Sequence, residues 1–167
     1  MEGWAEKTTT KKGYFGEDIV TEYLKSKRYV VYQPEDPEIA HVVDLLAYSF
    51  SKNELIAVEV KAKPEREFFP DTGFDIAVYH QYKKIQEKMD VAVFFVDENS
   101  ATVYGNFLQR LEIPTKLWLR GKNLSYPLRQ HGIIYFPTDN MKIIGQLTLK
   151  QVVELKKLST RDPQYNS

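Results

Sequence analysis

Three charged residues lie where the sequence otherwise indicates apolar β-strands. Asp44 falls inside the run VVDLL, and Glu59 and Lys61 fall inside the run AVEVKAK. Side chains two residues apart on a strand leave the same face, so Glu59 and Lys61 point to one side while the intervening Val60 points to the other. Because an unpaired carboxylate is costly among apolar neighbours, Asp44 requires a partner.

Asp44 and Glu59 are expected to approach each other across a β-hairpin. The polar turn SKN (residues 51–53) separates two strand-like segments, residues 39–50 and about 55–63, and so short a connection favours antiparallel pairing. The two carboxylates lie at similar distances from this turn and therefore share one cross-strand neighbourhood. They repel each other unless a cation lies between them.

Two carboxylates and a lysine are suited to the hydrolysis of phosphodiester bonds with Mg²⁺. This ion is commonly bound by one or two carboxylates together with water and phosphate oxygens. It activates water and holds the phosphate, while a nearby ammonium positions the water or stabilises developing negative charge. The alternative is structural: a surface hairpin on which Glu59 and Lys61 form an ordinary ion pair.

The surrounding pattern predicts an α/β domain built on a mixed sheet. Apolar residues at helical spacing predict a first helix, within TTTKKGYFGEDIVTEYLKSKRY. The continuous apolar run VAVFFV (residues 91–96) is typical of a central strand covered on both faces. The other expected elements are a strand at 29–32, a loop marked by Pro64, Pro70 and Gly73, a helix at 74–89, a short edge strand at 102–104, a helical turn at 107–111, strands at 117–119, 133–136 and 142–147 with a hairpin around TDNM, and a terminal helix capped by Thr148 and Gln151.

At these residues the chain resembles the PD-(D/E)xK nuclease superfamily, the restriction-endonuclease-like group that includes archaeal-type Holliday junction resolvases and many phage nucleases. Asp44 matches the first acidic position, and Glu59-Val60-Lys61 matches (D/E)xK. The sequence departs from the motif at Val43, which stands where a proline often precedes the aspartate. The likeness spans about residues 13–97.

The opening of this segment, GYFGEDIVTEYLKSKRYVV, is similar to the first helix of the resolvase-like members and places Glu17 at the position of their glutamate. Glu17 shares a helix side with Val20 and Leu24, so it can face the sheet. Asp18 is the adjacent alternative. A structural alternative for Glu17 is an acidic residue favoured by the helix dipole in a first turn.

The resemblance implies a single nuclease domain over residues 1–167, with the restriction-endonuclease-like core at about 13–97 and a basic extension of short strands and a terminal helix at about 107–160. It implies a Mg²⁺-dependent endonuclease acting on DNA, with Mn²⁺ as a substitute ion. Asp44, Glu59 and Val60 are then the metal ligands, Lys61 is the catalytic lysine, and Glu17 is the fourth member of the site. Resolvase-like members cleave branched DNA such as Holliday junctions as homodimers, so both features are expected, with roles in DNA recombination and repair.

The charges are unevenly distributed along a chain whose formal net charge is zero. From Thr115 to Arg161 there are nine basic and two acidic residues, a net charge of +7, whereas residues 34–114 carry fifteen acidic and eight basic residues, a net charge of −7. The basic segment suits contacts with phosphates, although Trp118, between two leucines, is expected in the core. The expected nucleic-acid contacts are Lys63, Lys84, Arg120, Lys122 and Arg129.

The composition excludes cysteine chemistry and gives no sign of a signal peptide or a membrane span. The sequence has no cysteine, which excludes disulfides, thiolate metal sites and cysteine nucleophiles. The start MEGWAEKTTTKKG lacks the apolar core of a signal peptide, and no apolar run reaches the roughly 20 residues of a membrane span, so a soluble cytoplasmic protein without a membrane partner is expected. Three alternatives are a non-cleaving nucleic-acid-binding or assembly module with the same fold, a nuclease for linear DNA or RNA in repair or defence, and an unrelated α/β interaction domain in which Glu59-Val60-Lys61 is a coincidence.

Overall fold

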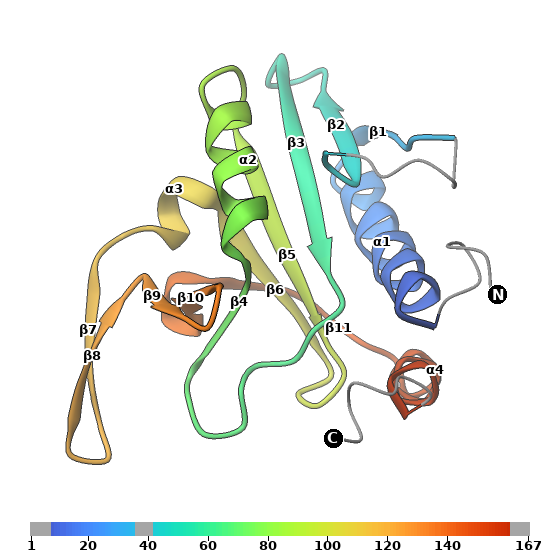
Figure 1. The fold of residues 1–167 in the computed structure, drawn as a ribbon. Coiled ribbons are helices and arrows are strands. Elements are labelled where there is room, and N and C mark those ends of the chain that lie inside the picture. Colours follow the sequence, from blue (N-terminus) through green and yellow to red (C-terminus); the bar gives the residue numbers. More distant parts are fainter. Residues whose placement is uncertain (1–7, 36–41, 161–167) are drawn as a thin grey trace, which may run out of the picture.

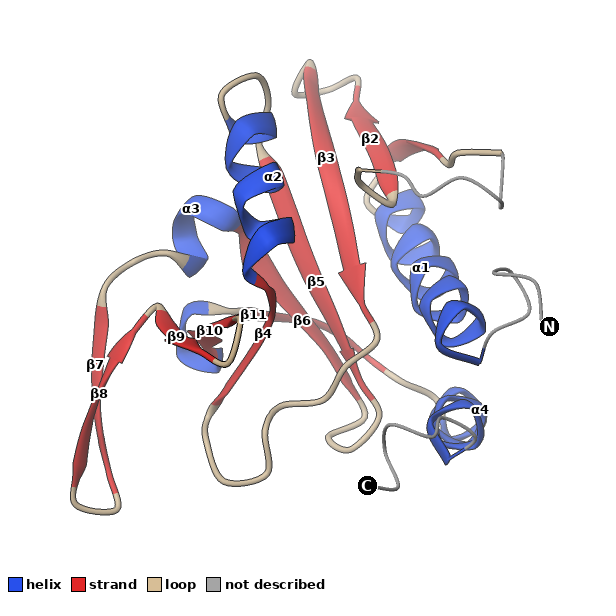
Figure 2. Ribbon diagram, in the orientation of Figure 1, coloured by secondary structure: helices blue, strands red, loops and turns tan. Residues whose placement is uncertain are grey.

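The chain folds around a six-stranded sheet that helices cover on both faces (Figures 1 and 2). The computed structural model describes residues 8–35 and 42–160. Its helices are α1 (Thr8–Ser26), α2 (Ile76–Gln86), α3 (Leu108–Leu111) and α4 (Leu149–Thr160). Its strands are β1 (Tyr29–Tyr32), β2 (Leu45–Ser49), β3 (Glu54–Lys61), β4 (Asp71–Asp75), β5 (Val91–Asp97), β6 (Thr102–Phe107), β7 (Thr115–Leu119), β8 (Lys122–Tyr126), β9 (Leu128–Gln130), β10 (Ile133–Pro137) and β11 (Lys142–Gln146).

The central sheet has the order β1-β2-β3-β5-β6-β11. β3 and β5 run parallel, and the other neighbours pair antiparallel. β5 is buried along its whole length, and its alternate residues enter two different apolar clusters. The predicted mixed sheet and its doubly covered central strand are therefore confirmed.

Each face of the central sheet has its own apolar layer. On one face Val20 of α1 and Leu155 of α4 pack in a cluster with Val60 of β3. On the other face Tyr82 of α2 packs in a cluster with Phe95 of β5. Since Val60 faces α1, its neighbours Glu59 and Lys61 face the side of the sheet that carries α2.

Two smaller sheets adjoin the α2 side. One has the order β4-β10-β9, and the other is the β7–β8 hairpin (residues 115–126), here called the arm, which extends away from the rest of the molecule in Figure 1. The arm turns at Arg120-Gly121 and the β9–β10 hairpin turns at His131-Gly132. In both turns the two central residues have positive φ, 51° and then 77°, as two-residue type I′ turns require.

The hairpin around the predicted site differs from expectation at its ends. β2 begins at Leu45 rather than at residue 39, and of the missing part residues 39–41 lie outside the described residues. Pairing with β3 stops there because the side chain of Asp44, and not a strand carbonyl, accepts the N–H of Val60. β3 ends at Lys61, so Lys63 lies in the loop that follows.

The predicted helix at 74–89 is wrong at its start. Residues 71–75 form β4, in which Phe74 pairs with Ile134 of β10, and α2 begins only after Asp75, whose side chain accepts the N–H of Ala77 at 2.7 Å. Gly73 belongs to this strand because a Cβ there would lie 1.9 Å from the carbonyl oxygen of Ile134. The glycine thus permits close strand pairing instead of marking a loop.

The C-terminal half contains two further corrections. The strand predicted at the edge, residues 102–104, is part of β6, which lies between β5 and β11 inside the sheet. The predicted hairpin around TDNM is also wrong, because β10 pairs with β4 and β9 whereas β11 pairs with β6. A short 3₁₀ turn, Thr138–Asn140, separates these two strands. The predicted helical turn corresponds to α3.

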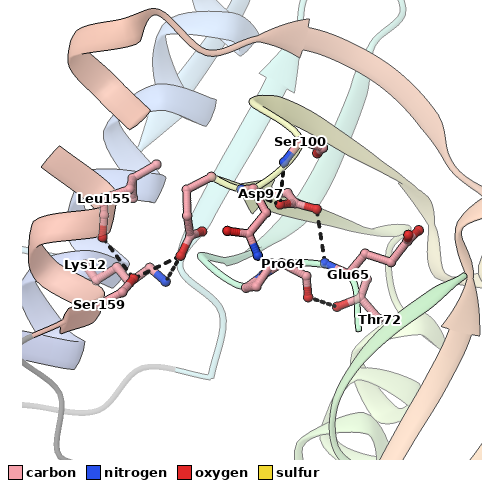
Figure 3. Close-up of polar contacts among 10 residues, drawn as sticks. Lys12, Pro64, Glu65, Thr72, Asp97, Ser100, Leu155 and Ser159 are labelled. Atoms are coloured by element: carbon pink, nitrogen blue, oxygen red, sulfur yellow. Dashed lines mark hydrogen bonds and ion pairs between the residues drawn. The ribbon is translucent and has the colours of Figure 1, made fainter. Parts of the chain in front are cut away.

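Buried polar contacts fix the elements that flank the site (Figure 3). Lys12 Nζ lies 2.7 Å from Glu98 Oε1, and Ser159 Oγ donates to the same oxygen at 2.9 Å, which ties α1 and α4 to the end of β5. Asp97 Oδ2 accepts the N–H of Glu65 at 3.0 Å and so holds the loop that leaves β3.

The terminal helix begins as predicted. The N–H of Thr148 donates to Gln151 Oε1 at 2.8 Å, and the N–H of Gln151 donates to Thr148 Oγ1 at 3.2 Å, which is a capping box. In the part of the chain that the structure describes, no helix has the length and apolar character needed to cross a membrane.

Candidate active site

Asp44 and Glu59 lie at the same end of two neighbouring strands. Leu45 pairs with Val58 in the antiparallel β2–β3 ladder, so the next positions along the chain, 44 and 59, face each other. Asp44 Oδ2 accepts the N–H of Val60 at 2.7 Å, which fixes the carboxylate against β3. The structure therefore brings these two residues together across the hairpin, as the spacing from the turn predicts.

Lys61 extends the site toward α2. Its Nζ lies 2.6 Å from Glu59 Oε1. The same ammonium lies 5.9 Å from the ring centroid of Phe74 and 6.0 Å from that of Tyr82, within the range of cation–π attraction. Because Phe74 belongs to β4 and Tyr82 to α2, both elements define the position of the lysine.

Glu17 enters the site from α1. Its carboxyl group hydrogen-bonds the carboxylate of Asp44, whereas Asp18 is exposed. Glu17 also lies well inside α1, which begins at Thr8, so the dipole of a first helical turn does not account for it. Of the two acidic residues considered from the sequence, the structure therefore brings only Glu17 to the other carboxylates.

Burial raises the pKa values of these carboxyl groups, and the charge of Asp44 adds to the shifts of Glu17 and Glu59. Burial, followed by the charge of Asp44, raises the pKa of Glu59 from 4.5 to about 7, even though Lys61 opposes the shift. Burial and the neighbouring Asp44 raise the pKa of Glu17 to about 8. Burial also raises the pKa of Asp44, against the opposing effects of the Val60 N–H and the Lys61 ammonium. Without a bound cation, Glu17 and Glu59 therefore retain protons near neutral pH that exposed carboxyl groups would have lost.

Tyr82 is a site residue that the sequence analysis missed. Its hydroxyl interacts with the carboxylate of Glu59, and the residue is only 1% exposed. Burial, and then the charge of Glu59, raises the pKa of the phenol, so it remains a hydrogen-bond donor. From this helix the sequence analysis selected only Lys84, whereas the inward-facing Tyr82 is the residue next to the carboxylate.

The oxygen donors fit a hard divalent cation. Asp44 and Glu59 offer carboxylate oxygens, and Val60 offers only a main-chain carbonyl because its side chain is apolar. Among the described residues, no three or more His, Asp or Glu side chains already converge as a closed metal cluster. An open pair of carboxylates is nevertheless the type of site that Mg²⁺ uses, since it retains several waters and takes oxygens from its substrate.

The loop after β3 is held by a second buried carboxylate. Arg66 contacts Asp71 through two N–H···O bonds of 2.6 and 2.7 Å, and Tyr126 Oη donates to Asp71 Oδ2 at 2.5 Å. The guanidinium of Arg66 also lies 3.7 Å from the ring centroid of Tyr135. We call the contacts among Arg66, Asp71 and Tyr126 the Asp71 clamp. It joins the loop that follows Lys61 to the base of the arm.

The basic residues expected to contact nucleic acid occupy three regions. Lys63 lies in the clamped loop, where its Nζ donates to the carbonyl of Gly73 at 3.0 Å and where burial, Lys61 and Arg66 lower its pKa. Lys84 is exposed on α2. The other three lie exposed in the C-terminal extension, on or beside the two small hairpins: Arg120, Lys122 and Arg129. Only Lys63 lies next to the carboxylate site.

Trp118 corrects another expectation from the sequence. Its side chain is 71% exposed on β7 and is therefore not part of the core. Strand alternation explains the error, because the flanking Leu117 and Leu119 turn to the opposite, half-buried face of the arm.

No family model matches the sequence, and the search of curated proteins finds no match. Among solved structures, the fold is similar to that of Archaeoglobus fulgidus Hjc, described as a Holliday junction resolvase from an archaeal hyperthermophile. The two chains are 13% identical, the similarity covers 77% of this chain and 90% of that chain, and the TM-score is 0.52. The matched share exceeds residues 13–97, on which the sequence resemblance rests. The chain thus has the restriction-endonuclease-like fold that this resolvase also has.

Proposed function

We propose that this chain is a divalent-metal-dependent endonuclease that hydrolyses phosphodiester bonds of DNA at the site of Asp44, Glu59 and Lys61. The observation that carries the proposal is the meeting of Asp44, Glu59 and Lys61 at one end of the β2–β3 hairpin, with Glu17 of α1 beside Asp44. Their raised pKa values are those of carboxyl groups gathered for a cation. The fold similarity to a resolvase supports the same conclusion.

Each residue has a proposed task. Asp44 and Glu59, with the carbonyl of Val60, would hold Mg²⁺ or its substitute Mn²⁺, and the ion would supply an activated water and neutralise charge on the phosphate. Lys61, held beside Glu59, stabilises negative charge that develops on the phosphate. Glu17 hydrogen-bonds Asp44 and orients that carboxylate, as the fourth member of the site.

The proposed substrate is branched DNA of the Holliday junction type. This part of the proposal rests on the similarity to a protein described as a Holliday junction resolvase and on the basic residues of the extension. Their charge offsets the repulsion between the acidic site and the phosphates. The whole chain would form one nuclease domain that works as a homodimer. Its phosphate contacts would be Lys63, Lys84, Arg120, Lys122 and Arg129.

The test compares cleavage of a synthetic four-way junction with cleavage of linear duplexes that have the same arm sequences, in Mg²⁺ and in EDTA. Glu59→Ala and Lys61→Ala remove the two members of the site's ion pair. Lys83→Ala and Glu112→Ala are matched controls, because these residues form an ion pair of 2.9 Å between α2 and the end of α3. We expect cleavage only with Mg²⁺ and loss of about 100-fold or more in the site variants, with the control variants unchanged.

The outcomes separate the alternatives. Cleavage in EDTA, or activity that survives both site substitutions, would refute the mechanism. Equal cleavage of junction and duplex would leave a nuclease and remove the branched substrate. Binding of DNA without any cleavage would replace the enzyme with a non-cleaving binding module.

A further inference from the structure

The arm carries an exposed tryptophan, Trp118. Trp118 lies in the middle of β7, 71% exposed, on a hairpin that extends from the body of the molecule (Figure 2). A large aromatic side chain left in water at such a place gives up most of the stabilisation that burial would provide. The feature contributes little to the fold and therefore points to an interaction.

The two faces of the arm differ in chemistry. Lys116 and Trp118 alternate along β7 and share its exposed face, and the register places Ser125 opposite Lys116 and Asn123 opposite Trp118. Arg120 follows in the turn of the arm and is also exposed. The other face carries leucines that are half-buried. The exposed face thus combines one aromatic ring with a cation on each side and with small polar groups. This composition suits a nucleic-acid strand, because bases stack on aromatic rings and phosphates attract the cations.

The arm also contacts the loop that leaves the candidate active site. The guanidinium of Arg120 lies 5.0 Å from the ring centroid of Phe68 in that loop. The same loop carries Lys63, whose pKa is lowered by burial and then by the charges of Lys61 and Arg66. The turn of the arm therefore lies beside the loop that follows Lys61.

We propose that the exposed face of the arm binds an unpaired DNA base, with Trp118 stacked on the base and Lys116 and Arg120 on the flanking phosphates. The inference rests on the proposed nuclease function only for its substrate class. A paired duplex covers both faces of each internal base, so Trp118 finds a free base face only at a branch, a gap or a single strand. The arm then selects DNA that contains unpaired bases.

A second copy of this chain is a less favourable partner than DNA for the exposed face of the arm. Docking of the arm on the same face of another arm would place Lys116 and Arg120 of the two copies near each other. Like charges brought together in an interface oppose association. The same charges favour a polyanion.

Trp118 itself can report binding. The chain has two tryptophans, Trp4 and Trp118, so a Trp4→Phe variant leaves Trp118 as the single indole reporter. Its fluorescence is measured in EDTA, which prevents cleavage, during titration with oligothymidylate, with a four-way junction that contains unpaired thymines at its centre, and with a long linear duplex in which nearly all bases are internal and paired. We expect saturable quenching with the first two and little with the duplex.

Affinity measurements on variants complete the test. Trp118→Ala is expected to weaken binding to oligothymidylate about 5- to 100-fold, the range for loss of one base stack, and to change duplex binding less than about 2-fold. Trp118→Phe should restore most of the loss, because it keeps a ring. Leu149→Ala, which removes another exposed apolar side chain on α4, is the matched control and should bind like the unchanged protein.

The outcomes keep this proposal separate from the nuclease. Equal quenching by duplex and single strand, or unchanged affinity of Trp118→Ala, overturns the proposal even if Mg²⁺-dependent cleavage is found. Selective quenching supports it even if no cleavage is found. If Trp118→Ala instead lowers the sedimentation coefficient and leaves DNA affinity unchanged, the arm is a contact between copies of the chain, and the proposal fails.

Discussion

Replacement of Glu59 by glutamine should make the metal-free protein less sensitive to alkaline pH. The pKa of Glu59 is raised from 4.5 to about 7, so the folded protein holds this proton more tightly than the unfolded chain does. The stabilisation is complete below pH 4.5 and is lost as the pH rises through about 7. At about 1.4 kcal/mol per pKa unit, the loss is on the order of 3 kcal/mol for this almost fully buried group. Glutamine has no titratable proton in this pH range, so the variant lacks this part of the fall in the free energy of unfolding.

The measurement is the free energy of unfolding in urea, with EDTA present, at several pH values between about 5 and about 8. The stability of the unchanged protein should fall over this range by about 3 kcal/mol more than that of Glu59→Gln. Part of the decline should remain in the variant, because the pKa of Glu17 is about 8. Millimolar Mg²⁺ should restore stability at the upper end of the range in the unchanged protein only.

Two results would refute this reasoning. If the stabilities of the two proteins changed with pH in parallel, the pKa of Glu59 would not be raised in the folded state. A rise in stability of the unchanged protein between pH about 5 and about 8 would give the opposite sign to that expected from a raised carboxyl pKa. Glu112→Gln serves as the control, since Glu112 is also a glutamate that pairs with a lysine.

Three other predictions concern single contacts. Tyr82→Phe removes the hydroxyl that contacts Glu59 and should raise the Mg²⁺ concentration for half-maximal cleavage about 10- to 100-fold, measured by metal titration. Lys12→Met leaves Glu98 buried without this cation and should lower the free energy of unfolding by about 3 to 5 kcal/mol, whereas the added change Glu98→Leu should recover most of it. Lys122→Gln should reduce the slope of log affinity for duplex DNA against log salt by about 0.9 if Lys122 contacts one phosphate.

The parts of the site that the sequence predicted are those set by local spacing. Glu59 and Lys61 leave one face of a strand because they are two residues apart, and a short turn brings Asp44 opposite them. Glu17 required the resemblance to a known family, since a glutamate on a helix has many structural explanations. The placement of these residues is therefore recoverable from short-range pattern and motif, whereas their roles stay proposals.

The missed features depend on partners distant in sequence. Residues 71–75 form a strand because β10, some sixty residues further along the chain, pairs with them. Tyr82 has the periodicity of a core residue, and only the packing of α2 on β3 and β5 shows that its hydroxyl meets Glu59. The exposure of Trp118 depends on which side of β7 faces the body, and β8, the partner that fixes this, was not predicted. Its turn, Arg120-Gly121, lacks the Asn-Gly or Asp-Gly pair that usually signals a two-residue hairpin turn.

The Asp71 clamp fixes the distance between the arm and Lys61 in the proposed enzyme. Asp71 is fully buried and holds Arg66 of the loop after Lys61 and Tyr126 at the base of the arm, so movement of the arm relative to Lys61 would break charge-assisted hydrogen bonds. A strand whose unpaired base is stacked on Trp118 would then be cut at a constant number of nucleotides from that base, whatever the sequence between them.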